Sequence, residues 1–196
     1  MVYRYKKYSL LIMAAILIAF IATYFILDQK LVTYIAKGTA DHIVFKDVSE
    51  IEKVSPIIVE VVATAESKTY YRPTSNPGVI RIPDTKTKVQ VTKIHKNDGR
   101  VTLGSLIEVV ERIHIEDKGI IPGKIIYNIE NTTKMIPGVK YLLFLEWMDA
   151  HQAYGIYGLH QGKINLDGKD QHEIEMQNVN STFGGFKQSV LKKYGI

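Results

Sequence analysis

The sequence predicts a mainly β protein in which an N-terminal transmembrane helix is followed by a small β-barrel with a short leading helix and a C-terminal helix. Two observations support this fold class. Residues 9–27 contain no charged side chain, and about 20 apolar residues are what a helix needs to cross a bilayer. Beyond residue 56 the chain is a series of short, β-branched apolar runs separated by Gly, Pro, Asn and Asp, which is typical of an all-β domain.

The composition excludes several classes of protein. The chain has 196 residues, 46% of them apolar and 23% charged, so it is neither a disordered polyampholyte nor a low-complexity chain. It contains no cysteine, which excludes a disulfide scaffold, a thiolate zinc site, a cysteine nucleophile and an acylated cysteine anchor.

The apolar segment at residues 9–27 is interpreted as an uncleaved signal-anchor that crosses the cell membrane once. Residues 1–8 then form a cytoplasmic tail, because Arg4, Lys6 and Lys7 precede the span and positive charges stay in the cytoplasm. The rest of the chain is expected outside, in an extracytoplasmic location. The lipid bilayer is therefore the first predicted partner.

The alternative is a secretory signal that is removed by cleavage. Such signals have a shorter apolar core, roughly 7–15 residues, and a small-x-small site soon after it. Gly38-Thr39-Ala40 is the best match to that site, but it lies far beyond residue 27. The lengths favour the anchor.

A stalk is predicted at residues 28–43, which have no clean hydrophobic period, and one extracytoplasmic β-barrel domain is predicted at residues 44–196. The domain should open with a helix at 44–54, ended by Pro56, because the residue before a proline avoids helical geometry. The apolar residues of this segment lie on one helical stripe: Val44, Val48, Ile51 and Val54.

Strands follow this helix along most of the remaining chain. They are predicted at residues 57–65, 87–94, 106–115, 124–129 and 141–147. Residues 153–159 and 163–166 read as a hairpin that turns at Gln161-Gly162, and 172–177 as a last short strand.

A helix is predicted at 186–194, and the irregular segment 72–83 is a long loop of the kind that is either disordered or functional. We favour a closed barrel over a sandwich, because closure removes the unpaired edge strands that invite aggregation.

The order of these elements resembles a group of uncharacterised membrane-anchored extracytoplasmic proteins of Gram-positive bacteria. The resemblance covers roughly residues 44–166 and is carried by the order of several segments. They are a helix that ends at Ser55-Pro56, IIVEVVATAE (57–66), TKVQVTKIHKNDG (87–99), IPGVKYLLFL (136–145) and the predicted hairpin at 154–162 with Gly162-Lys163. It implies an OB-like barrel similar to netrin-like and metalloproteinase-inhibitor domains. It does not imply inhibition, since those inhibitors chelate zinc through an N-terminal cysteine that this chain lacks.

No pattern of catalytic or metal-binding residues stands out. The six histidines are isolated, with no H-E-x-x-H motif, and neither a G-x-S-x-G elbow nor a phosphate loop is present. Acidic residues such as Glu108, Glu111 and Glu116 read as a solvated strand face. We therefore predict no cofactor, no metal and no catalytic residue.

Aromatic and basic side chains are the best candidates for binding a ligand. OB-type barrels bind oligosaccharides and oligonucleotides on a strand face and in loops, with stacked aromatics and nearby cations. The residues chosen on this ground are Tyr70, Tyr71, Arg72, Arg81, Trp147 and Tyr154. The alternative is that these tyrosines cap the barrel with their hydroxyl groups in water.

The sequence thus predicts a single-pass, membrane-anchored binding or interaction domain without catalysis, with an envelope protein or polysaccharide as its partner. Nucleic acid is not expected as a partner. Of the 25 Lys and Arg, three precede the span, which leaves 22 against 20 acidic residues on the exported part.

The alternative is a cell-envelope hydrolase or metal-dependent enzyme that uses His and Asp residues of the barrel loops. It requires one pocket to hold at least three of a particular set: His95, His114, Asp149, His151 and His160.

Overall fold

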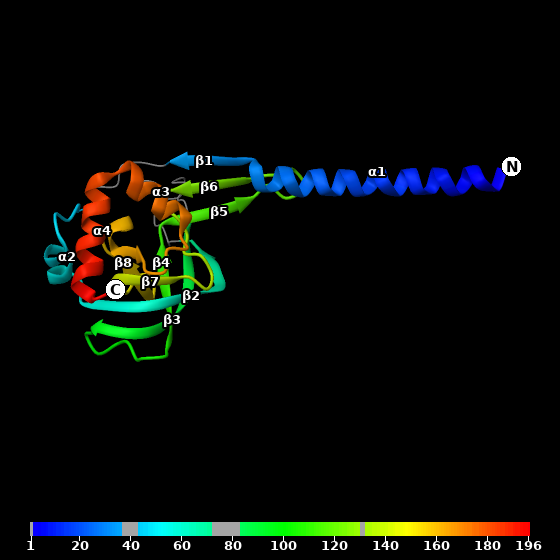
Figure 1. The fold of residues 1–196 in the computed structure, drawn as a ribbon. Helices are drawn as coiled ribbons and strands as arrows, with labels where there is room; N and C mark the ends of the chain where they lie inside the picture. The colour runs from blue at the N-terminus through cyan, green and yellow to red at the C-terminus, as the bar shows by residue number, and fades with distance from the viewer. Residues whose placement is uncertain (1, 37–42, 72–82, 130–131) are drawn as a thin grey trace. The chain divides into compact units, whose positions relative to one another are not determined.

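The computed structural model describes residues 2–36, 43–71, 83–129 and 132–196, which form two compact units. Unit 1 comprises Met1–Ile35 and Ile115–Tyr127, and unit 2 comprises Ala36–His114 and Asn128–Ile196. The chain is mostly sheet and carries an apolar N-terminal helix (Figure 1), so both of these predictions are confirmed.

Unit 1 begins with helix α1 (Val2–Lys30). Its segment Leu11–Lys30 has a mean hydropathy of 2.4 and none of it is buried. Within the described part of the chain this is the one helix long and apolar enough to span a membrane, a test that an N-terminal signal sequence also passes.

A three-stranded sheet follows α1 in unit 1. Its strand order is β1 (Val32–Ala36), β6 (Lys124–Asn128) and β5 (Ile113–Asp117). Within the segment predicted as a stalk, 28–43, α1 continues to Lys30 and a strand follows it, while residues 37–42 lie outside the described residues. The VTYIA sequence of β1 suits a strand, but the partner that pairs with it lies about ninety residues later, beyond the reach of local pattern.

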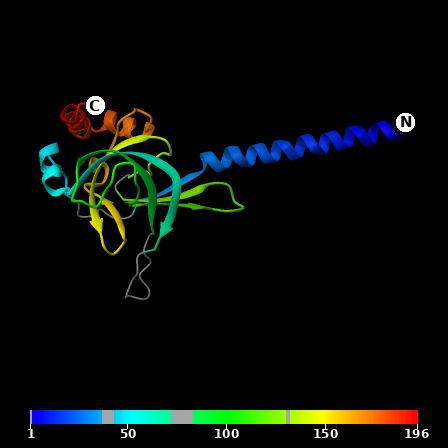
Figure 2. The ribbon, with the colours of Figure 1, turned by 90° about the horizontal axis from the view of Figure 1, so that it is seen from below.

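Unit 2 is built on a six-stranded sheet with the order β2-β3-β4-β8-β7-β9. Several of its strands are strongly curved, as Figure 2 shows. The strands are β2 (Ile57–Tyr70), β3 (Asp84–Lys96), β4 (Leu106–Glu111), β7 (Lys140–Met148), β8 (Ala153–Ile156) and β9 (Lys163–Asn165). β2 also pairs antiparallel with β7, from Ile57 opposite Leu145 to Val62 opposite Lys140. β4 and β8 pair in parallel over only two residue pairs.

Strand β7 is buried on both of its faces. Tyr141, Leu143 and Leu145 belong to a core cluster with alternate residues of β2, while Leu142 and Phe144 belong to a second cluster. Because side chains alternate across a strand, a run of consecutive apolar residues needs a cover on each side. The second cluster is completed by residues of α2 (Val48–Val54) and α4 (Ser181–Tyr194), which lie side by side in Figure 1.

The C-terminal part of the chain differs from the sequence prediction. Residues 172–177 were predicted as a strand, but they lie in helix α3 (Gln171–Val179). Asp170 caps this helix by accepting a hydrogen bond from the Glu173 amide at 3.2 Å. The local capping signal therefore outweighs the apparent alternation. Helix α4 begins at Ser181, earlier than predicted, because Asn180 caps it.

The predicted hairpin across Gln161-Gly162 is wrong. β8 and β9 do not pair with each other, and each pairs with a different part of β7. A short 3-10 helix, η1 (Leu159–Gly162), connects them. Gly158 has a positive φ of 59°, and a Cβ on Gly162 would lie 1.8 Å from the Tyr157 carbonyl oxygen, so the chain doubles back too tightly for two-strand pairing.

The predicted strand at 106–115 is likewise divided. β4 ends at Glu111 and β5 begins at Ile113, and the two strands belong to different sheets.

Candidate functional site

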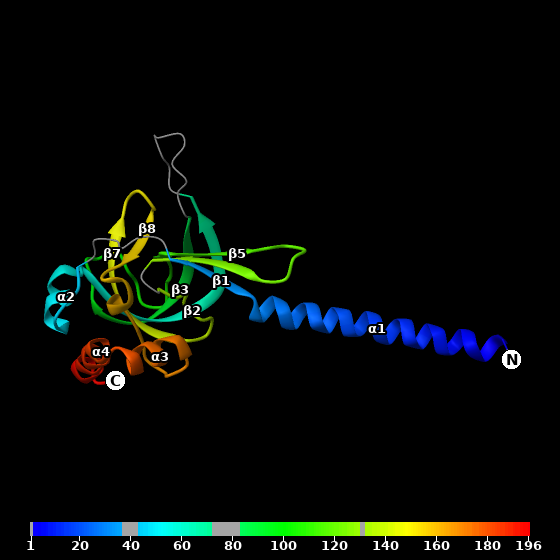
Figure 3. The same ribbon diagram turned by 90° about the horizontal axis from the view of Figure 1, so that it is seen from above.

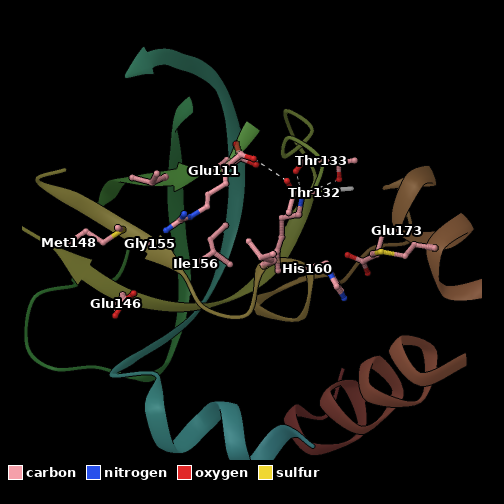
Figure 4. Close-up of a pocket in the computed structure, with 14 residues that line it drawn as sticks. Glu111, Thr132, Thr133, Glu146, Met148, Gly155, Ile156, His160 and Glu173 are labelled. Carbon is pink, nitrogen blue, oxygen red and sulfur yellow. Dashed lines mark hydrogen bonds between the residues drawn. The ribbon is translucent and has the colours of Figure 1, made fainter. Parts of the chain in front are cut away.

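A cavity of about 60 Å³ lies in unit 2 among β4, β8, η1, α3 and the segment before β7 (Figure 4). Its lining combines charged, hydroxyl and apolar side chains. The lining residues are Val110, Glu111, Arg112, Thr132, Thr133, Glu146, Met148, Gly155, Ile156, Leu159, His160, Lys163, Glu173 and Met176.

Glu111, the last residue of β4, is a buried carboxylate at one end of this cavity, with only 3% of the residue exposed. One carboxylate oxygen accepts a hydrogen bond from the Met135 amide at 2.6 Å, and the other accepts from the Thr87 hydroxyl. Burial raises the pKa of Glu111, and the Lys163 ammonium and these two donors offset part of that rise. The cavity thus holds a carboxyl group that binds a proton more tightly than one in water.

Lys163, on β9, supplies the nearby positive charge. Its ammonium donates to the Thr133 carbonyl oxygen and lies 3.3 Å from the Thr133 hydroxyl oxygen. Thr132 in turn donates its hydroxyl to the Arg112 carbonyl oxygen at 3.1 Å. Both threonine hydroxyls are therefore engaged in holding the segment before β7 against the sheet.

Glu173 and His160 lie together at the other end of the cavity (Figure 4). The Glu173 carboxylate, from α3, forms an ion pair of 2.7 Å with Lys187 of α4, and both side chains are at least nine-tenths buried. Its two oxygens also accept from the Asn165 amide at 3.0 and 2.9 Å. Burial raises the pKa of Glu173, while Lys187 opposes that rise. The His160 ring packs edge-on against Phe183, with 5.2 Å between ring centroids.

Met148, Gly155 and Ile156 form another part of the lining, on the side of the cavity away from Glu173 (Figure 4). Gly155 lies directly under Met148, because a Cβ on Gly155 would approach the Met148 sulfur to 2.3 Å. Glu146 stands at the half-buried rim, and burial together with a hydrogen bond to Glu146 raises the pKa of Tyr157 to about 12. Carboxylates, cations and thioethers around one small cavity suit a ligand that has an apolar group flanked by hydrogen-bonding groups.

The aromatic residues chosen from the sequence gather partly around the β7–β8 turn. Tyr70 donates its hydroxyl to the Ala150 carbonyl oxygen at 2.7 Å, and its ring lies 5.0 Å from the ring of the buried His151. Lys86 places its ammonium 4.2 Å from the centre of the Tyr70 ring. Tyr71 is exposed. Arg72 and Arg81, and with them the predicted 72–83 loop up to residue 82, lie outside the described residues.

Trp147 and Tyr154 are neighbours across β7 and β8, with ring centroids 5.0 Å apart. The Trp147 indole donates to Asp149 at 2.7 Å, whereas the Tyr154 ring is buried in the core and only 6% exposed. Neither residue lines the cavity around Glu111.

The histidines are spread over separate surroundings. His95 hydrogen-bonds Glu60 at 2.8 Å, and His151 lies 3.5 Å from a carboxylate oxygen of the buried Asp84. Of the five residues on which the enzyme alternative depends, only His160 lines the cavity. No group of three or more His, Asp or Glu side chains that could hold a metal ion occurs among the residues that the structure describes.

Glu111, Lys163 and Glu173 are functional candidates that the sequence did not indicate. Glu111 was read as part of a solvated face, although it directly follows the apolar pair Val109-Val110 at a strand end. That position was the only available signal, because Lys163 and Glu173 approach the cavity through the tertiary fold.

The chain was compared with protein-family models, curated proteins and solved structures, and no match was found in any of the three.

Proposed function

We propose that this protein is a single-pass, membrane-anchored extracytoplasmic domain that binds a partner and catalyses no reaction. Its N-terminus lies in the cytoplasm, and its β-rich domain lies outside. The expectation of an OB-like barrel is part of this proposal, and the return of strand pairing from β7 to β2 supports it.

The single observation that supports a retained membrane anchor is how the end of α1 is bound to the residues that follow it. The Asp28 carboxylate accepts a hydrogen bond from the Gly123 amide at 2.9 Å, and the Lys124 amide donates to the Leu31 carbonyl oxygen at 2.9 Å. Strand β1 then pairs with β6. A secretory signal is followed by a site at which a peptidase cuts, and the signal is then removed. Here the residues after the apolar segment are instead part of a folded unit, which supports an anchor that is retained.

The cavity between Glu111 and Glu173 is the proposed binding site. Its mixture of apolar walls and buried charges fits a side chain presented by a polypeptide, because a polypeptide offers donors and acceptors on both sides of an apolar group. We therefore propose an envelope protein as the partner. The dispersal of the histidines supports binding over the enzyme alternative.

The anchor and its orientation are tested by single-cysteine labelling, since the chain has no cysteine of its own. Leu103, which is exposed in unit 2, is replaced by Cys, and Val2→Cys reports the N-terminus. A membrane-impermeant maleimide added to intact cells should label Leu103→Cys and not Val2→Cys. The chain should remain in the membrane after alkaline extraction. Release by alkali, or the opposite labelling pattern, contradicts the proposal.

The binding site is tested with a photo-crosslinking amino acid at position 146, on the rim of the cavity, in intact cells. It should form an adduct of defined size with one partner, and Met176→Trp, which fills the cavity, should abolish that adduct. The same probe at the exposed Leu103 is the control and should give no such adduct. An adduct that survives Met176→Trp, or forms equally from position 103, contradicts a role for the cavity.

A further inference from the structure

We propose that the turn of the β5–β6 hairpin, residues 118–123, inserts into the outer leaflet of the membrane beside α1 and is a second membrane contact of this protein. The proposal rests on α1 being the membrane span of the proposed function. The hairpin and the end of α1 both belong to unit 1 and are drawn beside each other in Figures 1 and 3.

The turn exposes two adjacent isoleucines. Ile120 is 94% exposed and Ile121 is 68% exposed. Tight turns are normally made of Gly, Asn, Asp, Ser and Pro, whose backbones or side chains suit the turn and whose surfaces suit water. Gly119, with a φ of +71°, already meets the conformational need of this turn, so the two isoleucines are not required for the backbone geometry.

Hydrogen bonds fix the depth of this turn along α1. The Tyr24 hydroxyl donates to the Gly119 carbonyl oxygen at 2.7 Å, and the Gly123 amide donates to Asp28 at 2.9 Å. Tyr24 lies four residues before Asp28, which is about 6 Å along a helix axis. Ile120 and Ile121 therefore extend from a point level with Tyr24, inside the apolar segment Leu11–Lys30. Interfacial elements bury their apolar side chains by about 5–10 Å, the same scale.

The backbone contact at Gly123 holds the turn in this position. Gly123 has a φ of +115°, and a Cβ there would approach the Leu31 carbonyl oxygen to 2.5 Å. Lys118 lies on the polar side of the turn, where its ammonium is 3.4 Å from the Thr33 hydroxyl oxygen. The turn that carries the two exposed isoleucines is thus held to α1 and the start of β1 by hydrogen bonds.

A bilayer is the occupant that this arrangement fits. The segment Leu11–Lys30 of α1 has a mean hydropathy of 2.4 and none of it is buried, so the isoleucines lie beside a surface that already needs lipid. Tyrosine at that level is typical of the membrane interface.

The test uses the full chain in vesicles of phosphatidylcholine and phosphatidylglycerol, with one cysteine carrying an environment-sensitive fluorophore. The positions are Ile120→Cys for the turn, Ile18→Cys for the span and Leu103→Cys for the exposed surface of unit 2. Lipids with a nitroxide near the top of the acyl chain should quench the probe at 120 and leave the probe at 103 unaffected. A nitroxide at the middle of the acyl chain should quench the probe at 18.

Each outcome has a separate meaning. Quenching at 18 without quenching at 120 contradicts the proposed insertion of the turn but agrees with the membrane anchor. Absence of quenching at 18 overturns the anchor itself, and with it the basis of this inference. Ile121→Cys provides a second reporter if Ile120→Cys fails to fold.

Tyr24→Phe tests the hydrogen bond that sets the depth. It removes the hydroxyl that holds Gly119 and keeps the aromatic ring, so quenching at 120 should fall at least twofold while quenching at 18 stays unchanged. Equal quenching at 120 in both chains would show that the Tyr24 bond does not set the depth, contrary to the proposal.

Discussion

The buried ion pair between Glu173 and Lys187 should make a large contribution to stability at the residue scale. Both side chains are buried, and they join α3 to α4. Lys187→Met leaves the Glu173 carboxylate buried without its cation, and breaking such a pair costs about 3–5 kcal/mol. Chemical unfolding of the full chain in detergent should show this loss in the free energy of unfolding.

The matched control is the double variant Glu173→Leu with Lys187→Met. It removes both charges together and should be less destabilised than Lys187→Met alone, because no uncompensated charge remains. The Asn165 amide loses its acceptor in that variant, so part of the loss should persist. A double variant less stable than the single one would count against this account.

Glu111 makes stability depend on pH. Burial holds its pKa above the ordinary value of 4.5, so the folded chain keeps a proton that the unfolded chain gives up. The free energy of unfolding is therefore fully retained below about pH 4.5 and falls as the pH rises above that value, until Glu111 ionises in the folded state. The side chain of Glu111→Gln cannot ionise, so the unfolding free energy of this variant should not show this part of the fall with pH.

The measurement compares the urea midpoints of wild type and Glu111→Gln at about pH 5 and about pH 8. Between the lower and the higher pH, the urea midpoint of the wild type should fall more than that of Glu111→Gln. The glutamine still accepts from Met135 and meets Thr87, so the fold is expected to survive. Identical declines in the two chains would show that Glu111 does not titrate differently on folding.

The candidate site shows which residues a sequence can reveal. Tyr70 and Trp147 were chosen for their type, and both do contact the β7–β8 turn, through Ala150 and Asp149. The cavity itself depends on Glu111, Lys163 and Glu173, which lie on β4, β9 and α3. These three residues are far apart in the sequence, and only the tertiary fold brings them together. No local pattern therefore indicated the cavity.

At the scale of single elements, the two glycines of α4 allow a clean comparison. A Cβ added to the exposed Gly185 meets no atom within 4 Å, whereas one added to Gly184 lies 3.3 Å from atoms of Gln177. Gly185→Ala should raise the free energy of unfolding by about 0.5–1 kcal/mol, since alanine loses less backbone entropy in a helix.

Gly184→Ala serves as the paired control, because it has the same helical gain and a contact that α3 must accommodate. In thermal unfolding, Gly184→Ala should have a lower midpoint temperature than Gly185→Ala. If the two alanine variants were equally stable, the tight contact with Gln177 would carry no energetic weight.

Elements were predicted well where their pattern is local. The apolar helix, β7 and most of β2 follow from runs of residues that need no distant partner to be recognised. The differences from the prediction fall at β1, at the division between β4 and β5, at α3 and between β8 and β9. β1 depends on a strand about ninety residues away, α3 on a cap at Asp170, and the β8–β9 connection on the tight turn at Gly158 and Gly162.

At the scale of the whole molecule, the charge distribution predicts orientation. Replacing Arg4, Lys6 and Lys7 by Asn removes the cations that precede the span, so the fraction of chains with unit 2 outside the cell should fall. Impermeant labelling of Leu103→Cys measures this fraction.

A control with the same change in charge replaces three exposed lysines of unit 2 by Asn: Lys46, Lys169 and Lys192. It should leave the labelled fraction unchanged. Equal losses of labelling in both variants would mean that net charge, and not its position, decides the orientation.

The pairing of β2 with β7 has a consequence for how the chain is made. Ile57 lies opposite Leu145, so β2 leaves the ribosome well before its partner does. At about 5–20 residues per second, the gap lasts roughly 4 to 18 s. During that time β2 has only β3 to pair with, and a row of β-branched side chains remains uncovered. Nascent chains of this protein should therefore depend on a holding chaperone until residue 148 has been synthesised.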